Sequence, residues 1–101
     1  MMMEVAFDKM MHQIDDELDG AHKYIECAIV KKEDAPEMSD MYIRLANTEM
    51  EHGTMIHDAT KKFLEKNNAP KELWAVWDWQ NAKYLDRVAH LKAKMEAVRK
   101  S

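Results

Sequence analysis

With 101 residues, the chain is long enough for one domain, residues 1–101, with a modest hydrophobic core. Its net charge of -4 disfavours a polyanion such as DNA as a partner and mildly favours cations. Gly and Pro number only two each, which is typical of an almost entirely helical protein. A single cysteine, Cys27, excludes an internal disulfide. We predict neither a signal peptide nor a membrane span, and therefore a cytoplasmic protein.

The first predicted helix runs from about Val5 to Lys32. Its apolar residues recur every three or four positions in two adjacent stripes, the pattern of an amphipathic helix with a wide buried face. One stripe contains Phe7, Met11, Ile14, Leu18, Ala21, Ile25 and Ala28. The other contains Met10, Ile14, Glu17, Ala21, Tyr24 and Ala28. The second stripe thus has a carboxylate at its centre.

The second predicted helix begins near Asp34 and ends at about Lys66. Asp34 is a suitable capping residue, Pro36 is tolerated in a first turn, and Glu37 stands where a capping box needs an acid. The segment Asn67-Asn68-Ala69-Pro70 ends this helix and starts the next.

The third predicted helix spans about Lys71 to Lys100. Its apolar stripe contains Trp74, Trp77, Asn81, Tyr84, Val88, Leu91, Met95 and Val98. We expect the cluster of Trp74, Trp77 and Trp79 to pack this helix on the other two or at a subunit contact.

The most informative pattern lies in the second helix and is called here the Glu49 stripe. It contains Met38, Tyr42, Leu45, Glu49, His52, Ile56, Ala59 and Phe63. Its spacings of four and three predict a face that points at a partner helix. Burying Glu49 and His52 there without partners would be costly. A carboxylate and an imidazole one turn apart can instead share a metal ion.

The position of Glu17 supports such a site. A short connection predicts that the first two helices form an antiparallel hairpin, with its turn centred near Glu33. Glu17 and Glu49 each lie 16 residues from that point. At 1.5 Å per residue both are roughly 24 Å from the turn, so they lie at the same height. Glu17, Glu49 and His52 are therefore predicted to converge.

These ligands make up half of a two-metal site. Di-iron carboxylate bundles use a Glu from each of two helices and a Glu-x-x-His from each of the other two. The third helix has no Glu-x-x-His, and its Asp78, Asp86 and Glu96 lie beside or away from its apolar stripe. A two-fold dimer would supply the missing half, because a symmetric interface presents the same patch twice. Iron suits mixed oxygen and nitrogen ligands, and manganese or zinc also fits this ligand type.

The residues resemble the ferritin-like superfamily, which includes ferritins, rubrerythrins and encapsulated ferritins. The resemblance covers about residues 15–63 and is greatest to the encapsulated ferritins, whose chain is a half-ferritin of this length. The matching motifs are Glu17-x6-Tyr24, Glu49-x-x-His52 and Asp16-Glu17-Leu18-Asp19. The fold expected from this resemblance is all-α: a two-helix hairpin plus a long third helix, dimerising into a ferritin-like four-helix bundle.

The resemblance also implies a function. It implies a ferroxidase that oxidises Fe(II) to Fe(III) at a di-iron centre shared across a homodimer interface, for iron storage or detoxification. In each chain Glu17 would be a terminal ligand, Glu49 a bridging ligand and His52 a terminal nitrogen ligand. Outside the ligands, the resemblance implies a hydrogen-bonding role near the metals for Tyr24 and attraction of incoming ferrous ions by Asp16 and Asp19.

Encapsulated ferritins assemble as rings of dimers inside an encapsulin shell, which makes that compartment a second expected location. Residues 94–101 do not resemble the small apolar tail that targets proteins to such a shell. The long third helix with its tryptophans also departs from the family pattern. The shell partner and the ring therefore stay open, whereas the metal ligands are unaffected.

Two other functions compete with this one. The chain can be a helical interaction or structural protein in which Glu17, Glu49 and His52 form a buried polar network. It can also be a peroxide-reducing protein of the rubrerythrin type, although it has no Cys-x-x-Cys pair for a rubredoxin-like iron.

Other titratable residues are expected to have lesser roles. A line of four, one turn apart on the first helix, consists of Asp15, Asp19, His22 and Glu26. We interpret this line as a solvated acidic face rather than a weak metal site. His57 and His90 fall outside the apolar stripes and are predicted to be solvent-exposed.

Overall fold

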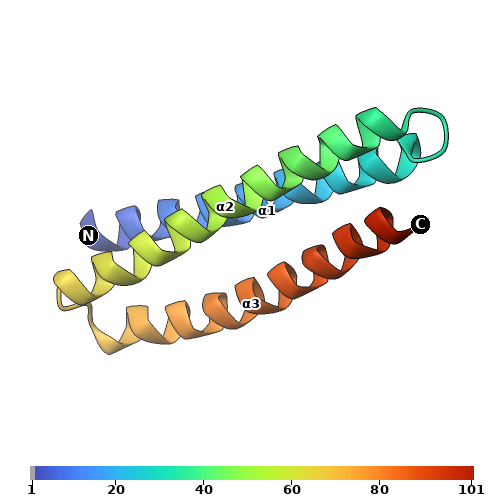
Figure 1. Ribbon diagram of the computed structural model, residues 1–101. Helices are drawn as coiled ribbons and strands as arrows, with labels where there is room; N and C mark the ends of the chain where they lie inside the picture. Colours follow the sequence, from blue (N-terminus) through green and yellow to red (C-terminus); the bar gives the residue numbers. More distant parts are fainter. Residues whose placement is uncertain (1) are drawn as a thin grey trace.

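The computed structural model describes residues 2–101, which form three long helices and no strand. They are α1 (Met2–Lys31), α2 (Pro36–Lys66) and α3 (Lys71–Lys100). The helices α1 and α2 form an antiparallel hairpin, and α3 runs back along it, so the two termini lie at opposite ends (Figure 1). The molecule is a rod of 52 × 19 × 15 Å. The predicted all-helical fold and its three helices are confirmed.

The core lies between the helices of the hairpin and beneath α3. Small side chains at its centre, Ala21 and Ala46, are fully buried and allow α1 and α2 to pack closely. The buried residues of α1 are Phe7, Ile14, Leu18, Ala21, Ile25 and Ala28. They belong to the first predicted stripe, which is confirmed as the core face of this helix.

The buried face of α2 is not the Glu49 stripe. It consists of Ser39, Ile43, Ala46, Met50, Gly53, Thr60 and Leu64. In the Glu49 stripe, Met38 is 42% exposed, and Tyr42, Ile56 and Phe63 are only half-buried. The stripe does face α1 at its margin, because Tyr42 stacks on Tyr24 and Glu49 lies against Gly20 of that helix. The prediction that this stripe points at a partner helix is therefore confirmed only in part. The centre of the buried face lies next to the stripe, at residues such as Ala46 and Met50.

The turn between α1 and α2 is fastened by a serine rather than by the predicted capping box. The N-cap of α2 is Ala35, and it makes no side-chain cap hydrogen bond. The Ser39 hydroxyl instead donates to the carbonyl oxygen of Ala28 over 2.8 Å, in the buried core. Asp34 and Glu37 are exposed, whereas Pro36 occupies the first turn as predicted.

Helix α3 begins after a tight turn in which Asn68 has a φ of 48°, in the left-handed region that asparagine tolerates. Its buried residues are Trp77, Gln80, Tyr84, Leu91, Met95 and Val98. Trp74 packs against the core, but Trp79 is exposed and carries Lys83 over its ring. The tryptophans therefore pack α3 on the hairpin at two of their three positions. No helix within residues 2–101 is both long and apolar enough to cross a membrane.

Candidate metal centre

Glu17, Glu49 and His52 come together at one point on the hairpin. One ligand atom from each residue lies within 4.8 Å of the others. It is the only group of three such residues within residues 2–101 that has the geometry to hold a metal ion. The predicted convergence at equal height is thus confirmed. It follows because Glu49 and His52 share a face of α2, and that face lies level with Glu17 of α1.

The cluster lies at the edge of the core and opens toward solvent. The Glu17 side chain is 26% exposed and that of His52 is 49% exposed. One oxygen, Glu17 Oε2, is buried without a hydrogen-bond partner among the described residues. His52 Nδ1 lies 3.5 Å from this oxygen, which is too long for a strong hydrogen bond. With both carboxyl groups ionised, no group within residues 2–101 therefore satisfies this buried carboxylate oxygen.

The two carboxyl groups are electrostatically strained. The pKa of Glu49 is raised above its ordinary value, first by a hydrogen bond with Glu17, then by burial and by the negative charge of Glu17. His52 acts in the opposite direction. Two carboxylates that share a site resist carrying two full negative charges. The pair consequently favours either a proton or a cation between its oxygens.

These features fit a divalent metal ion. Two carboxylates and one imidazole provide the oxygen and nitrogen donors that iron, manganese and zinc accept. A cation would provide a partner for Glu17 Oε2 and offset the repulsion between the two carboxylates. Three protein ligands leave open positions for further ligands, from solvent, substrate or a second chain.

The residues expected beside the cluster show other contacts. The Tyr24 ring stacks on Tyr42, with centroids 6.1 Å apart, and within the described chain its hydroxyl makes no hydrogen bond to the cluster. Asp19 forms an ion pair with Arg87 of α3, so its charge is already balanced. Asp16 is exposed. Attraction of incoming metal ions by these two residues stays a prediction. It suits the exposed Asp16 better than Asp19, which is paired with Arg87.

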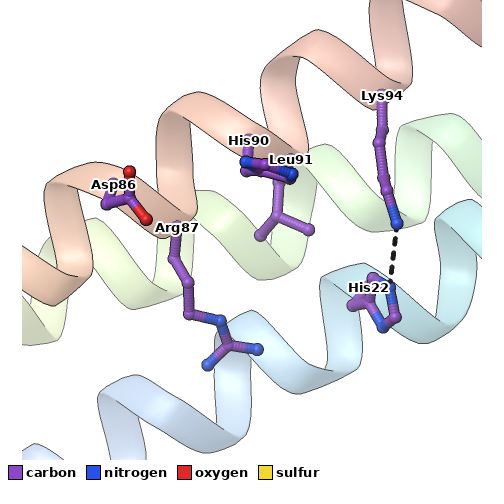
Figure 2. A pocket seen from close by; sticks show the side chains of 6 residues that line it. All are labelled: His22, Asp86, Arg87, His90, Leu91 and Lys94. Carbon is purple, nitrogen blue, oxygen red and sulfur yellow. Dashed lines mark hydrogen bonds between the residues drawn. The ribbon is translucent and has the colours of Figure 1, made fainter.

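The acidic line of α1 is not simply solvated, because it borders α3. Gln80 Nε2 donates to Asp15 Oδ1 over 3.1 Å, and Lys94 Nζ donates to His22 Nε2 over 3.3 Å. Figure 2 shows Lys94 reaching across from α3 to His22 of α1. Lys94 and His22 border a cavity of about 380 Å³ between α1 and α3. Its lining residues are His22, Asp86, Arg87, His90, Leu91 and Lys94. The line therefore helps to dock α3.

His57 is a structural residue that the sequence interpretation missed. Only 12% of its side chain is exposed, although it was predicted to lie in solvent; His90 is exposed as predicted. Its ring stacks on Tyr84 at 3.9 Å and lies 4.6 Å from the ring of Trp77. Its Nε2 lies 2.7 Å from Asn81 Oδ1. Spacings of four and seven from Gly53 and Met50 are the signal that places it on the buried face of α2.

No family model, curated protein or solved structure matches this chain. The features of the chain that bear on its function are the geometry of the Glu17–Glu49–His52 cluster and the motifs that contain these residues.

Proposed function

We propose that this protein is a ferroxidase that oxidises Fe(II) to Fe(III) at a two-metal centre shared by two copies of the chain. The observation that carries the proposal is the Glu17–Glu49–His52 cluster. Its ligand atoms lie within 4.8 Å of one another, and the buried Glu17 Oε2 has no hydrogen-bond partner within residues 2–101. Iron is the substrate of this reaction, and the three side chains are what hold it. Manganese or zinc has the same donor preferences and is the natural competitor.

An apolar surface around the cluster supports the proposal that two copies of the chain pair. The side of the hairpin that carries the cluster is called here the open hairpin face. Its apolar residues are Tyr24, Met38, Met41, Tyr42, Leu45, Ile56 and Phe63, all exposed or half-buried. Polar groups of α3 reach other side chains of the hairpin, namely Asp15, Thr54 and His57. The residues of this face stay exposed or half-buried. A two-fold pairing of this face would bury it and assemble a four-helix bundle from two hairpins.

The chemistry follows from the ligands. Two chains would contribute four carboxylates and two imidazoles to two ions. Two Fe(II) ions give up two electrons, which with two protons reduce O2 to hydrogen peroxide, or hydrogen peroxide to two water molecules. The anionic carboxylates favour the more highly charged Fe(III) product. Glu49 would bind metal as the carboxylate, so protons compete with the metal for its oxygens.

The competing structural role has weaker support. A polar network built for stability would satisfy its own atoms, yet Glu17 Oε2 has no partner within residues 2–101 and His52 is half exposed. A peroxide-reducing protein would use the same three ligands. Comparing O2 with peroxide as the oxidant separates that role from an O2-dependent ferroxidase. An encapsulin shell, a ring of dimers and storage of the product remain parts of the proposal.

The first prediction tests the ligands with a matched pair of variants. Glu49→Ala removes a metal ligand, whereas Glu51→Ala removes an exposed carboxylate two residues away on the same helix. We expect Glu49→Ala to abolish Fe(II) oxidation and Glu51→Ala to retain it, with both variants nearly as helical as the parent. Fe(II) oxidation is followed by absorbance, and helicity by circular dichroism.

The number and position of the bound metal ions provide a second test of the shared centre. The proposal requires about one metal per chain, or two per dimer, bound between the two copies. Anomalous density in a crystal grown with Fe(II) would locate it. Normal oxidation by Glu49→Ala would contradict the proposal, as would iron bound only at sites away from Glu49.

A further inference from the structure

The chain has only two glycines, and both lie beside the cluster. Gly20 is three residues after Glu17 on α1, and Gly53 follows His52 on α2. Neither has a positive φ, so the backbone does not require glycine at either position. A glycine inside a helix is unfavourable relative to alanine. Each therefore calls for a reason in the packing around it.

Gly20 has such a reason and Gly53 does not. A Cβ atom added at Gly20 would lie 2.9 Å from Glu49 Oε2, a distance that real Cβ atoms essentially never show. The Glu49 side chain continues along this surface, with its Cδ at 3.5 Å and its Cγ at 3.6 Å from the same point. A Cβ added at Gly53 would meet only ordinary contacts, at 3.5 Å from Leu18 Cδ2 and 3.6 Å from Glu17 Cβ.

We propose that Gly20 is a positioning residue for Glu49: the missing side chain forms a notch in α1 that receives the Glu49 carboxylate and holds it beside Glu17. The metal part of this inference rests on the proposed function, whereas the steric part does not. The atom in conflict is the far end of a flexible side chain, so alanine at position 20 moves the carboxylate and leaves the helices in place. Glycine at position 20 thus lowers the stability of α1 relative to alanine, but it leaves room for the Glu49 carboxylate.

The metal-free protein tests the notch by itself. Gly20→Ala is made in the parent chain and in Glu49→Ala, and Gly53→Ala is made in the same two backgrounds as the matched control. We expect Gly20→Ala to raise the Tm clearly in the Glu49→Ala background and to raise it less, or lower it, in the parent. Gly53→Ala should shift the Tm by the same amount in both backgrounds. Equal shifts for Gly20→Ala in the two backgrounds would overturn the notch.

Metal binding tests what the notch does for the site. Co(II) serves as the probe, because its visible absorption reports the number and arrangement of its ligands. We expect Gly20→Ala to weaken Co(II) binding about 10- to 100-fold and to change its spectrum, as loss of ligand support does elsewhere. Gly53→Ala should keep both the affinity and the spectrum of the parent. An unchanged Co(II) spectrum in Gly20→Ala would overturn the positioning role.

The Tm experiment and the Co(II) experiment test different parts of the proposal, so one can contradict it while the other supports it. If the parent protein binds neither Co(II) nor Fe(II), the proposed function and the metal role of Gly20 are overturned together. The Tm comparison in metal-free protein still decides whether the notch holds Glu49. If the parent binds metal and the Tm shifts do not depend on Glu49, the proposed function stands and the notch is overturned.

Discussion

At the scale of single residues, the main feature of the Glu17–Glu49–His52 cluster is that two carboxyl groups lie close together and partly buried. Glu17 and Glu49 are held against one another at the edge of the core, and the pKa of Glu49 is raised mainly by its hydrogen bond with Glu17. An acid with a pKa that is higher in the folded than in the unfolded state favours folding only while it is protonated. Ionisation of Glu49 therefore destabilises the metal-free fold, and a bound cation would offset that cost.

The raised pKa of Glu49 predicts a pH dependence of stability. The stabilisation by its protonated form is complete below the ordinary glutamate pKa of 4.5 and is lost as the pH rises through the raised pKa of Glu49. Glu49→Gln keeps the shape of the side chain but cannot ionise. We therefore expect this variant to gain stability relative to the parent as the pH rises above 4.5, in metal-free protein. Urea denaturation between pH 4 and pH 8 measures the difference, and a constant difference would contradict the assignment.

At the scale of elements, the third helix is fastened to the hairpin by a small number of specific contacts. His57 of α2 lies between Trp77 and Tyr84 of α3, and Thr54 Oγ1 lies 2.7 Å from the hydroxyl oxygen of the same tyrosine. On the other side, Arg87 reaches Asp19 of α1. Geometrically matched contacts of this kind favour one docking of a helix, where apolar contact alone would allow several.

We predict that His57→Ala loosens α3. The variant loses two ring contacts and leaves Asn81 without its bond, a loss of about 1–3 kcal/mol in the free energy of unfolding. His90→Ala is the matched control, because His90 is exposed on α3 and should change stability by less than about 0.5 kcal/mol. Urea denaturation measures both, and hydrogen exchange of the α3 amides should accelerate only in His57→Ala. Equal stability of the two variants would show that this contact does not fasten the helix.

At the scale of the whole molecule, the hairpin has one covered side and one open side. Helix α3 packs along one side of the hairpin, and the open hairpin face carries exposed and half-buried apolar residues around the cluster. A chain of this size buries a smaller share of its surface than a large domain, so pairing of the open hairpin face would add to its core. The proposed dimer therefore serves stability and chemistry through the same surface.

A matched pair of methionines on α2 tests this pairing. Met38, 42% exposed, belongs to the open hairpin face, whereas Met55, 68% exposed, borders a groove between α2 and α3. We expect Met38→Glu to give monomers and little Fe(II) oxidation, because a charge buried in the interface is costly. Met55→Glu should remain dimeric and active. Sedimentation across a dilution series gives the mass, and a fully active monomer would contradict a shared centre.

The sequence by itself determined the three helices, the antiparallel hairpin and the meeting of Glu17, Glu49 and His52. These features depend on the helical period, on the turn residues and on the fixed rise per residue, all of which are local or follow from position along the chain. The equal distances of Glu17 and Glu49 from the turn placed them level without any knowledge of packing.

Only the tertiary structure decided which face of α2 is buried, that His57 is enclosed, that Asp19 is paired and that Gly20 lies against Glu49. Each of these depends on the side from which α3 approaches and on how closely α1 and α2 pack. The helical period allows adjacent stripes of α2 to serve as a core face, and the choice between them is made by the partner helices. The physical reason is that periodicity fixes which residues share a face, whereas the docking of other helices fixes which face is covered.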